Sequence, residues 1–203
     1  KEAKKNIHKW SRTKRVGTNM LNFPASSYII PEPLGVCLVI GAWNYPYQLT
    51  LAPVIAAIAA GNTVIIKPSE MAPKTSALMA NLINENFDSA FLKVVEGGVS
   101  ETTTLLKSKF DKIFFTGSPQ VGKIIYQAAA KNLTPVTLEL GGKSPAIITE
   151  DANLKMTVKR LVWAKFLNAG QTCIAPDYVL VHKSIVKKTL ELLKIEIEKE
   201  SFS

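Results

Sequence analysis

The stretch FFTGSPQVGKII, residues 114–125, decides the fold because an apolar, strand-like run enters a glycine turn and a helix-like run leaves it. Gly117, Gly122 and Lys123 fall at the spacing of a phosphate-binding P-loop, G-x-x-x-x-G-K. Such a loop needs Ser or Thr after the lysine to hold magnesium, and this chain has Ile124. The stretch therefore predicts a strand–turn–helix unit that can hold a phosphate without magnesium.

Ser118 and Pro119 predict where that helix begins, because Ser is a favoured N-cap and Pro suits the first helical position. The backbone N–H groups of such a turn, together with the helix dipole, favour phosphate. The usual dinucleotide fingerprint, G-x-G-x-x-G with an acid about 20 residues later, is absent. By itself the turn leaves two interpretations open, a pyrophosphate site and a strand-to-helix turn without a ligand.

The same alternation of strand and helix runs through most of the chain. Strands are predicted within 35–43, 63–70, 91–98, 112–118 and 135–142, the first two of them buried, and helices within 51–62, 72–87 and 119–131. The Ala-rich stretch Leu49–Ala60 reads as a buried helix, and Asn22–Pro33 reads as a connector rich in Pro and Ser. Apolar strands alternating with helices predict an α/β fold, a Rossmann-like parallel sheet with helices on both faces.

Composition limits the function classes. The chain has 203 residues and a net charge of +9, which fits one good-sized domain or somewhat more at about 150 residues per domain. No run approaches the roughly 18 uncharged apolar residues of a membrane span. The chain begins with Lys1 and no apolar signal region follows, so we expect a cytoplasmic piece of a longer protein, with membrane association of the whole left open.

The cysteines and histidines indicate the redox compartment and whether a metal site is expected. The two cysteines lie far apart, which suits a reducing compartment rather than a disulfide framework. No cluster of Cys, His, Asp and Glu has the spacing of a metal site, so we predict no metal.

The basic segment at 1–15, KEAKKNIHKWSRTKR, raises the question of a polyanionic partner. Single-strand binders usually offer several aromatic stacking platforms, and Trp10 is the one aromatic residue here. We therefore expect a solvated helix and connector, and no nucleic-acid partner.

Ligands of a parallel sheet lie beyond the carboxyl ends of its strands, and two polar residues near such ends could do chemistry. Asn44, after the first strand, carries an amide that suits an oxyanion, although Asn is also a common turn residue. Glu139 alternates with Val136, Leu138 and Leu140, so it points to the other face of its strand. A partly dry setting would tune it as a base, and the alternative is a Glu exposed at a sheet edge.

Cys173 lies in the small, polar, turn-forming stretch NAGQTCIAPD, whereas Cys37 lies inside an apolar strand. A reactive thiol needs an accessible, polar surrounding, so Cys173 is the better candidate for a nucleophile. The alternative is a small buried filler. No histidine is placed by the sequence to activate Cys173, which argues against a Cys–His protease.

Taken together, these stretches resemble the aldehyde dehydrogenase superfamily. The resemblance runs from about Glu32 to the end of the chain and is similar to the class 3 branch, which handles fatty and aromatic aldehydes. The stretches that carry it, in the order of that family, are EPLGVCLVIGAWNYPYQL, AAGNTVIIKPSE, FTGSPQVGK, TLELGGKSP and NAGQTCIAPDYVLV.

The resemblance implies roles for individual residues. Cys173 matches the nucleophile, Glu139 the general base, and Asn44 the oxyanion-hole amide, with the Cys173 N–H as second donor. The residues implied in cofactor binding are Trp43, Lys67, Glu70, Gly117, Ser118 and Gly122. The implied reaction is NAD(P)-dependent oxidation of an aldehyde to a carboxylic acid through a cysteine thiohemiacetal and a thioester.

The resemblance also implies a domain organisation. Residues 1–140 match most of an NAD(P)-binding domain, and residues 141–203 match the beginning of a second, α/β catalytic domain. Pro119 departs from the family, many of whose members have Thr there, and it removes one N–H from the pyrophosphate turn. The implied cofactor is NAD first, because Glu70 repels a 2′-phosphate, with NADP possible. The full-length protein is expected to be a homodimer.

Other readings stay open at this point. An acylating relative would share Cys173 and pass the acyl group to coenzyme A, whereas Glu139 favours hydrolysis. A non-catalytic nucleotide-binding relative, or an inactive fragment, would keep the fold without turnover.

Overall fold

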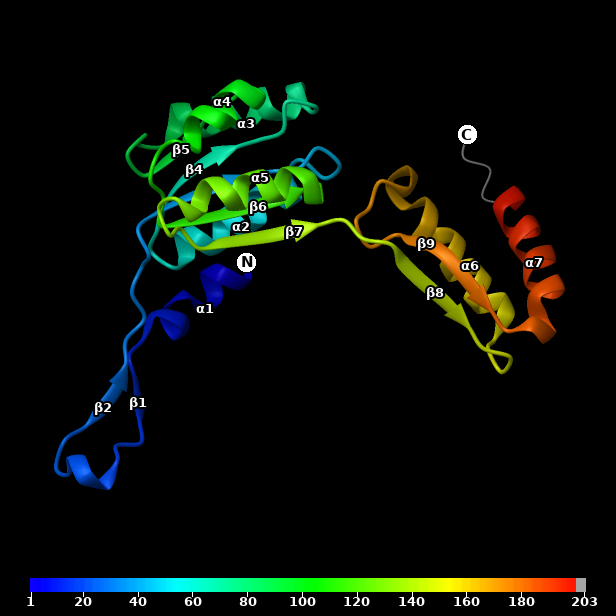
Figure 1. Ribbon diagram of the computed structural model, residues 1–203, viewed down its shortest axis with the longest axis horizontal. Helices are drawn as coiled ribbons and strands as arrows, with labels where there is room; N and C mark the ends of the chain where they lie inside the picture. The colour runs from blue at the N-terminus through cyan, green and yellow to red at the C-terminus, as the bar shows by residue number, and fades with distance from the viewer. Residues whose placement is uncertain (200–203) are drawn as a thin grey trace. The chain divides into compact units, whose positions relative to one another are not determined.

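The computed structural model describes residues 1–199, and the chain divides into two compact units, Lys1–Glu139 and Leu140–Ser203 (Figure 1). A domain boundary after residue 140 is expected from the sequence. The functions assigned to the two parts, cofactor binding and catalysis, stay predictions.

The first unit is built on a five-stranded sheet (Figure 1). Its strands lie in the order β5-β4-β3-β6-β7, and the pairs β3–β4, β3–β6 and β4–β5 are parallel. The predicted α/β, Rossmann-like sheet is therefore confirmed. The strands are β3 (Val36–Ile40), β4 (Thr63–Lys67), β5 (Leu92–Val94), β6 (Lys112–Gly117) and β7 (Val136–Leu140).

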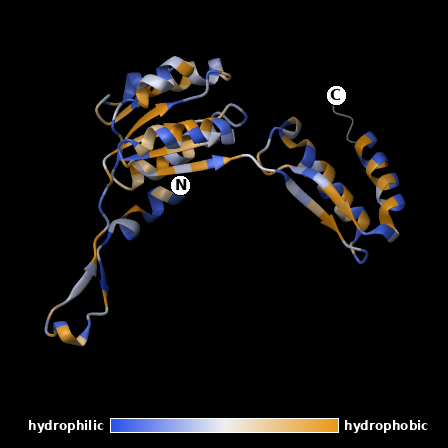
Figure 2. Ribbon diagram, viewed as in Figure 1, coloured by the Kyte–Doolittle hydropathy of each residue, from blue (hydrophilic) through white to orange (hydrophobic). Residues whose placement is uncertain are grey.

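Helices cover both faces of this sheet. They are α2 (Gln48–Ala59), α3 (Pro73–Asn86), α4 (Val99–Leu105) and α5 (Pro119–Ala130). Side chains of α2 and α3 join alternate residues of β3, β4 and β5 in one buried cluster, which includes Cys37 and Val39. The other residues of β3 and β6 face the opposite side, where α5 contacts β6. Figure 2 shows the apolar strands between these helices.

The strand order contains a switch point between β3 and β6. The chain runs outward from β3 through β4 to β5, and then returns to the other side of β3 with β6. In open parallel sheets the crevice for a ligand opens at such a point, beyond the carboxyl ends of the strands. The turns after β3 and β6 are thus where the topology places a ligand.

The predicted start of α5 is confirmed. Ser118 is the N-cap, and its hydroxyl accepts a hydrogen bond from the N–H of Val121 at 3.3 Å. Pro119 is the first helical residue. A strand that ends in glycine and a helix capped by Ser–Pro together give the sharp turn that the opening stretch predicts.

Two expectations differ from the structure. The stretch Leu49–Ala60 was predicted to be a buried helix, but within α2 only Thr50 and Val54 are buried and Ile55 is 55% exposed. The helix packs on one face of the sheet alone, so one stripe of it suffices for the core. The predicted connector 22–33 contains a strand, β2 (Ser27–Ile29).

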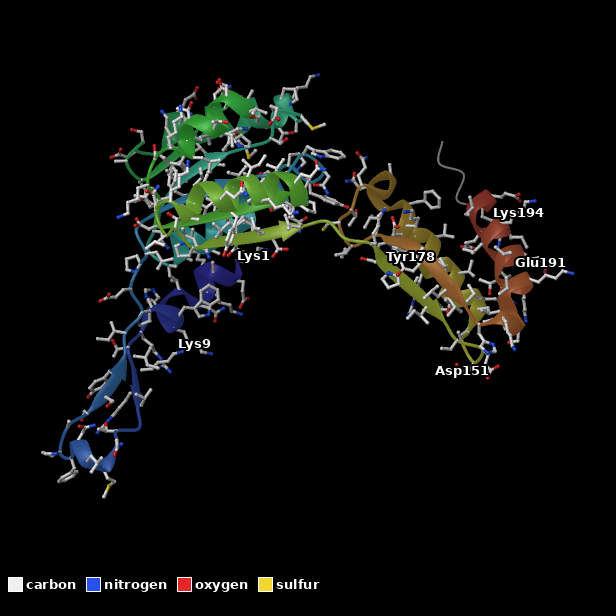
Figure 3. All side chains as sticks on the ribbon, viewed as in Figure 1. Lys1, Lys9, Asp151, Tyr178, Glu191 and Lys194 are labelled. Atoms are coloured by element: carbon white, nitrogen blue, oxygen red, sulfur yellow. The ribbon has the colours of Figure 1, made fainter. Side chains whose placement is uncertain are left out.

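The N-terminal part precedes the sheet. It contains helix α1 (Glu2–Ser11), as the sequence predicted, and strand β1 (Lys14–Val16), which pairs antiparallel with β2. A short helical turn, η1 (Met20–Asn22), joins the two strands. Figure 3 labels Lys9 on α1 and Lys1, the residue directly before that helix.

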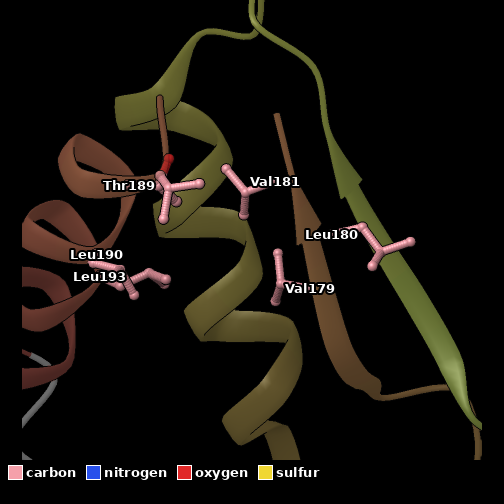
Figure 4. A pocket seen from close by; sticks show the side chains of 7 residues that line it. Val179, Leu180, Val181, Thr189, Leu190 and Leu193 are labelled. Atoms are coloured by element: carbon pink, nitrogen blue, oxygen red, sulfur yellow. The ribbon is translucent and has the colours of Figure 1, made fainter. Parts of the chain in front are cut away.

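The second unit is a smaller α/β layer. Strands β8 (Ser144–Ile148) and β9 (Pro176–Val181) pair in parallel, and the helices are α6 (Leu154–Phe166) and α7 (Val186–Lys199), with short turns η2 (Leu167–Gly170) and η3 (Lys183–Ile185). An apolar hollow of this unit is lined by residues of β9 and α7, namely Val179, Leu180, Val181, Val186, Thr189, Leu190 and Leu193 (Figure 4).

Within residues 1–199 no helix combines the length and the apolar character needed to cross a bilayer.

Candidate functional site

The turn after β3 carries Trp43 and Asn44 at the carboxyl edge of the sheet. The N–H of Gly41 donates to the carbonyl of Lys67 at 3.0 Å, which ties the beginning of this turn to the end of β4. Asn44 is half-buried and Trp43 is exposed. Asn44 lies beyond a central strand and beside the switch point, where its side-chain amide can contact a ligand.

Lys67 and Glu70 lie at the end of β4. The side chain of Lys67 is 2% exposed, and its Nζ donates to the carbonyl of Pro68 at 2.5 Å. Nζ is also 3.5 Å from a carboxylate oxygen of Glu70, whose side chain is exposed. A buried ammonium group needs such partners, because an unpaired charge in the interior is costly. The pair offers a ligand a fixed positive centre and an accessible carboxylate.

A second carboxylate, Glu101, belongs to the same edge and was not singled out by the sequence analysis. Its carboxylate accepts from the N–H of Gly98 at 2.7 Å, at the beginning of α4. Backbone hydrogen bonds, first from Glu101 itself and then from Gly98, hold the pKa of Glu101 below its ordinary value, and the charge of Lys67 adds to this. Gly98 is a residue type accepted at an N-cap and Glu101 stands three residues later, so the sequence carries half of the signal of a capping box.

The turn after β6 holds Gly117, Ser118 and Gly122. A Cβ on Gly117 would collide with the ring of Phe115, so only glycine fits there. Within the first helical turn Pro119 carries no N–H, and the N–H groups of Val121 and Gly122 donate to the hydroxyl and the carbonyl of Ser118. Much of the amide set that usually binds phosphate is thus already engaged by the cap.

Two buried hydroxyls at this edge have no hydrogen-bond partner in the described part of the chain, those of Thr50 and Thr116. Thr116 is the residue before Gly117 in β6 and is 8% exposed. Buried polar groups are nearly always paired, so an unpaired one at a ligand edge indicates a polar partner. Thr116 lies inside the opening stretch, yet no sequence pattern distinguishes its hydroxyl from that of any other strand threonine.

These residues fit a dinucleotide. The accessible carboxylate of Glu70, beside the buried ammonium group of Lys67, suits ribose hydroxyls. The turn at Ser118 begins helix α5, and a helix N-terminus suits phosphate. The unpaired hydroxyl of Thr116 can bond to a polar group of the ligand. Among residues 1–199 no group of three or more His, Cys, Asp and Glu side chains is arranged to hold a metal ion.

Glu139 lies near the end of β7, the edge strand of the sheet, and it is exposed. The partly dry setting considered for it from the sequence is therefore not found within the first unit. An edge strand leaves one side open to water, which is the alternative that the sequence analysis kept.

Cys173 belongs to the second unit and is exposed, whereas Cys37 is buried. It follows a strained turn, because Asn168 and Ala169 both have a φ of 54° and Gly170 has a φ of 75°. Left-handed backbone at a residue other than glycine costs free energy and gathers at functional sites. A thiol in an accessible, sharply turned loop can act as a nucleophile.

The model of the aldehyde dehydrogenase family matches residues 5–202. A 4,4'-diaponeurosporen-aldehyde dehydrogenase of Staphylococcus aureus is 55% identical over 185 residues, 91% of this chain and 40% of that protein. A dimeric NADP-preferring aldehyde dehydrogenase of Mus musculus is 50% identical over 190 residues, 94% of this chain and 42% of that protein.

Solved structures agree with these relatives. The substrate-bound state of Staphylococcus aureus AldH superposes with a TM-score of 0.94 at 51% identity, over 97% of this chain and 43% of that chain. A Mycobacterium tuberculosis aldehyde dehydrogenase complexed with NAD+ gives a TM-score of 0.83 at 32% identity, over 92% of this chain and 38% of that chain.

The chain therefore spans about two fifths of the length of the relatives that it matches. The family model covers nearly the whole chain and the fold superposes on that of a solved member, so the chain belongs to the aldehyde dehydrogenase family.

Proposed function

We propose that the full-length protein oxidises an aldehyde to a carboxylic acid with NAD(P). The observation that carries this proposal is the family match over residues 5–202, which includes an exposed cysteine after a strained turn. We propose fatty or aromatic aldehydes as substrates, because the sequence motifs resemble those of the class 3 branch. We also propose that the protein is cytoplasmic, and that it is a homodimer, since one relative is named as dimeric.

In the proposed mechanism the Cys173 thiolate attacks the aldehyde carbon and forms a thiohemiacetal. The oxygen becomes negative, and the Asn44 amide and the Cys173 N–H donate hydrogen bonds to it. Loss of one such donor costs about 100- to 1,000-fold in rate at comparable sites.

A bound dinucleotide supplies the acceptor for the hydride that this adduct must lose. Cys173 then carries the acyl group as a thioester. Glu139 takes a proton from a water molecule, whose oxygen attacks the acyl carbon and releases the carboxylic acid and the thiolate. An exposed Glu139 on an edge strand can exchange its proton with solvent before the next turnover.

For cofactor binding we propose Trp43, Lys67 and Glu70 on the adenosine side, and Gly117, Ser118 and Gly122 at the pyrophosphate. The Ser118 cap occupies the N–H of Val121, so the phosphates have few amides to contact and the remaining affinity comes from the ribose contacts. Glu70 disfavours a 2′-phosphate and Lys67, 3.5 Å away, offsets part of that repulsion. NAD is therefore the preferred cofactor, and NADP is accepted more weakly.

The deacylation step separates this proposal from an acylating relative. In the full-length protein, Glu139→Gln should release about one equivalent of NADH rapidly and then stall, because the thioester persists. Mass spectrometry should find the acyl group on the peptide that contains Cys173. Steady turnover of this variant at the wild-type rate would contradict the role of Glu139, and a wild-type requirement for coenzyme A would favour the acylating reading.

A further inference from the structure

Thr50 has a buried hydroxyl that the packing of the first unit does not explain. Its side chain is 0% exposed, and its Oγ1 has no hydrogen-bond partner within the described residues. Another buried threonine of this unit, Thr134, donates to the carbonyl of Phe110 at 2.7 Å. Burying an unpaired hydroxyl is costly, and valine would fill the same space without that cost. The hydroxyl therefore serves something other than the stability of this arrangement.

The position of Thr50 indicates what that is. A Cβ on Gly41 would collide with Thr50 Oγ1, so the hydroxyl occupies the space that a side chain at position 41 would take. Gly41 begins the turn that leads to Asn44, and its own N–H is already used in the hydrogen bond to Lys67. Thr50 lies in the first turns of α2, which follows directly on this loop. The hydroxyl thus lies against the backbone that carries Asn44.

Because Thr50 is fully buried, it cannot touch a substrate or a cofactor directly. We infer that Thr50 is a positioning residue for Asn44: its hydroxyl bonds to a backbone group of residues 41–44 when the turn holds the Asn44 amide against the reacting oxygen. This inference rests on the proposed function of Asn44. The turn at residues 41–44 then has two arrangements. The Thr50 hydroxyl is unpaired in the first and bonded to the backbone in the second, which the reaction stabilises.

The kinetic signature follows from where Asn44 acts. The amide stabilises charge that develops in the transition state, so its misplacement lowers kcat and leaves ground-state binding unchanged. A displacement of about 1 Å can cost up to about 100-fold in rate. For Thr50→Val in the full-length protein we expect kcat to fall about tenfold. The KM for the aldehyde and the Kd for NAD should stay at the wild-type values, and Thr50→Ser should recover most of the rate.

Stability provides the second readout. Thr50→Val should leave Tm unchanged or raise it, since it removes an unpaired buried hydroxyl. The matched control is Thr134→Val, which orphans the carbonyl of Phe110 and should lower Tm while kcat stays unchanged. Thr50→Val with the wild-type kcat would overturn the inference. A fall in Tm like that of the control would also overturn it, because the hydroxyl would then have a partner in the free protein.

A double-mutant cycle with Asn44→Ala tests the route of the effect. If Thr50 acts through Asn44, Thr50→Val should change kcat little once the amide is gone. A full tenfold loss in the Asn44→Ala background would contradict the inference. Failure of the proposed function is seen separately, because wild-type protein without aldehyde oxidation would remove the role of Asn44 before any Thr50 variant is compared.

Discussion

At the residue scale the two cysteines differ in exposure: Cys173 is exposed, as a nucleophile should be, and Cys37 is buried, as a packing residue should be. Burial is the main cause that raises the pKa of Cys37, and the charge of Asp111 adds to it, so this thiol stays protonated and shielded. Iodoacetamide should label Cys173 first, as peptide mapping of the folded protein would reveal, and label Cys37 only after unfolding. Rapid labelling of Cys37 in the folded chain would contradict this assignment, and Cys173→Ser, which leaves Cys37 as the one cysteine of residues 1–203, is the control.

Glu70 carries the prediction on cofactor choice. Glu70→Gln removes the carboxylate that repels a 2′-phosphate and leaves the buried Lys67 ammonium group without its partner 3.5 Å away. The affinity for NADP relative to NAD should rise about tenfold, measured by titration calorimetry of the full-length protein. Glu150→Gln, which removes an exposed carboxylate in the second unit, should leave that ratio unchanged. If the ratio of the NADP affinity to the NAD affinity were unchanged in Glu70→Gln, the adenosine ribose would not lie beside Glu70.

At the element scale, the strain in the turn before Cys173 should be measurable in the free energy of unfolding. Ala169 has a φ of 54°, where a Cβ costs about 1–2 kcal/mol, and glycine loses about 0.5–1 kcal/mol through the greater freedom of the unfolded chain. Ala169→Gly should therefore leave the free energy of unfolding unchanged or raise it by up to about 1 kcal/mol. Ala56→Gly, in the exposed part of α2, should lower it by about 1 kcal/mol. Equal losses in urea denaturation of the two variants would contradict the strain.

The cap of α4 makes the stability of the first unit depend on pH. The folded-state pKa of Glu101 is lowered from 4.5, so its contribution is fully present above that value and is lost as the pH falls through the lowered pKa. Glu101→Gln should be less stable than wild type at about pH 7, and the difference should shrink as the pH falls below 4.5. A series of urea denaturation curves at decreasing pH measures it, and a difference that does not shrink would assign the effect to something other than the carboxylate.

The sequence predicted elements well where local chemistry decides them and poorly where packing does. Ser118, Pro119 and the glycine before them define the start of α5 by themselves, and the structure agrees. The uniformly apolar stretch of α2 could not reveal which stripe would be buried, because its composition is nearly the same on all sides. Strand β2 was missed because three residues in a Pro- and Ser-rich segment give no readable period.

For the whole molecule, the α/β sheet and its family were predictable because strand ends carry recognisable motifs in a fixed order. The unpaired hydroxyls of Thr50 and Thr116 were not, because whether a hydroxyl finds a partner depends on neighbours that are distant in sequence. Likewise the exposure of Glu139 follows from the edge position of β7, which the strand order alone determines. The chain spans about two fifths of the relatives that it matches, so the proposed reaction is tested on the full-length protein.

The most direct test is NADH formation by the full-length protein with NAD and a medium-chain aldehyde, beside its Cys173→Ala variant. We expect the wild type to form NADH and the variant to form almost none while it binds NAD with the wild-type affinity. Equal NADH formation by both proteins would contradict the central claim, because the reaction would then not pass through Cys173.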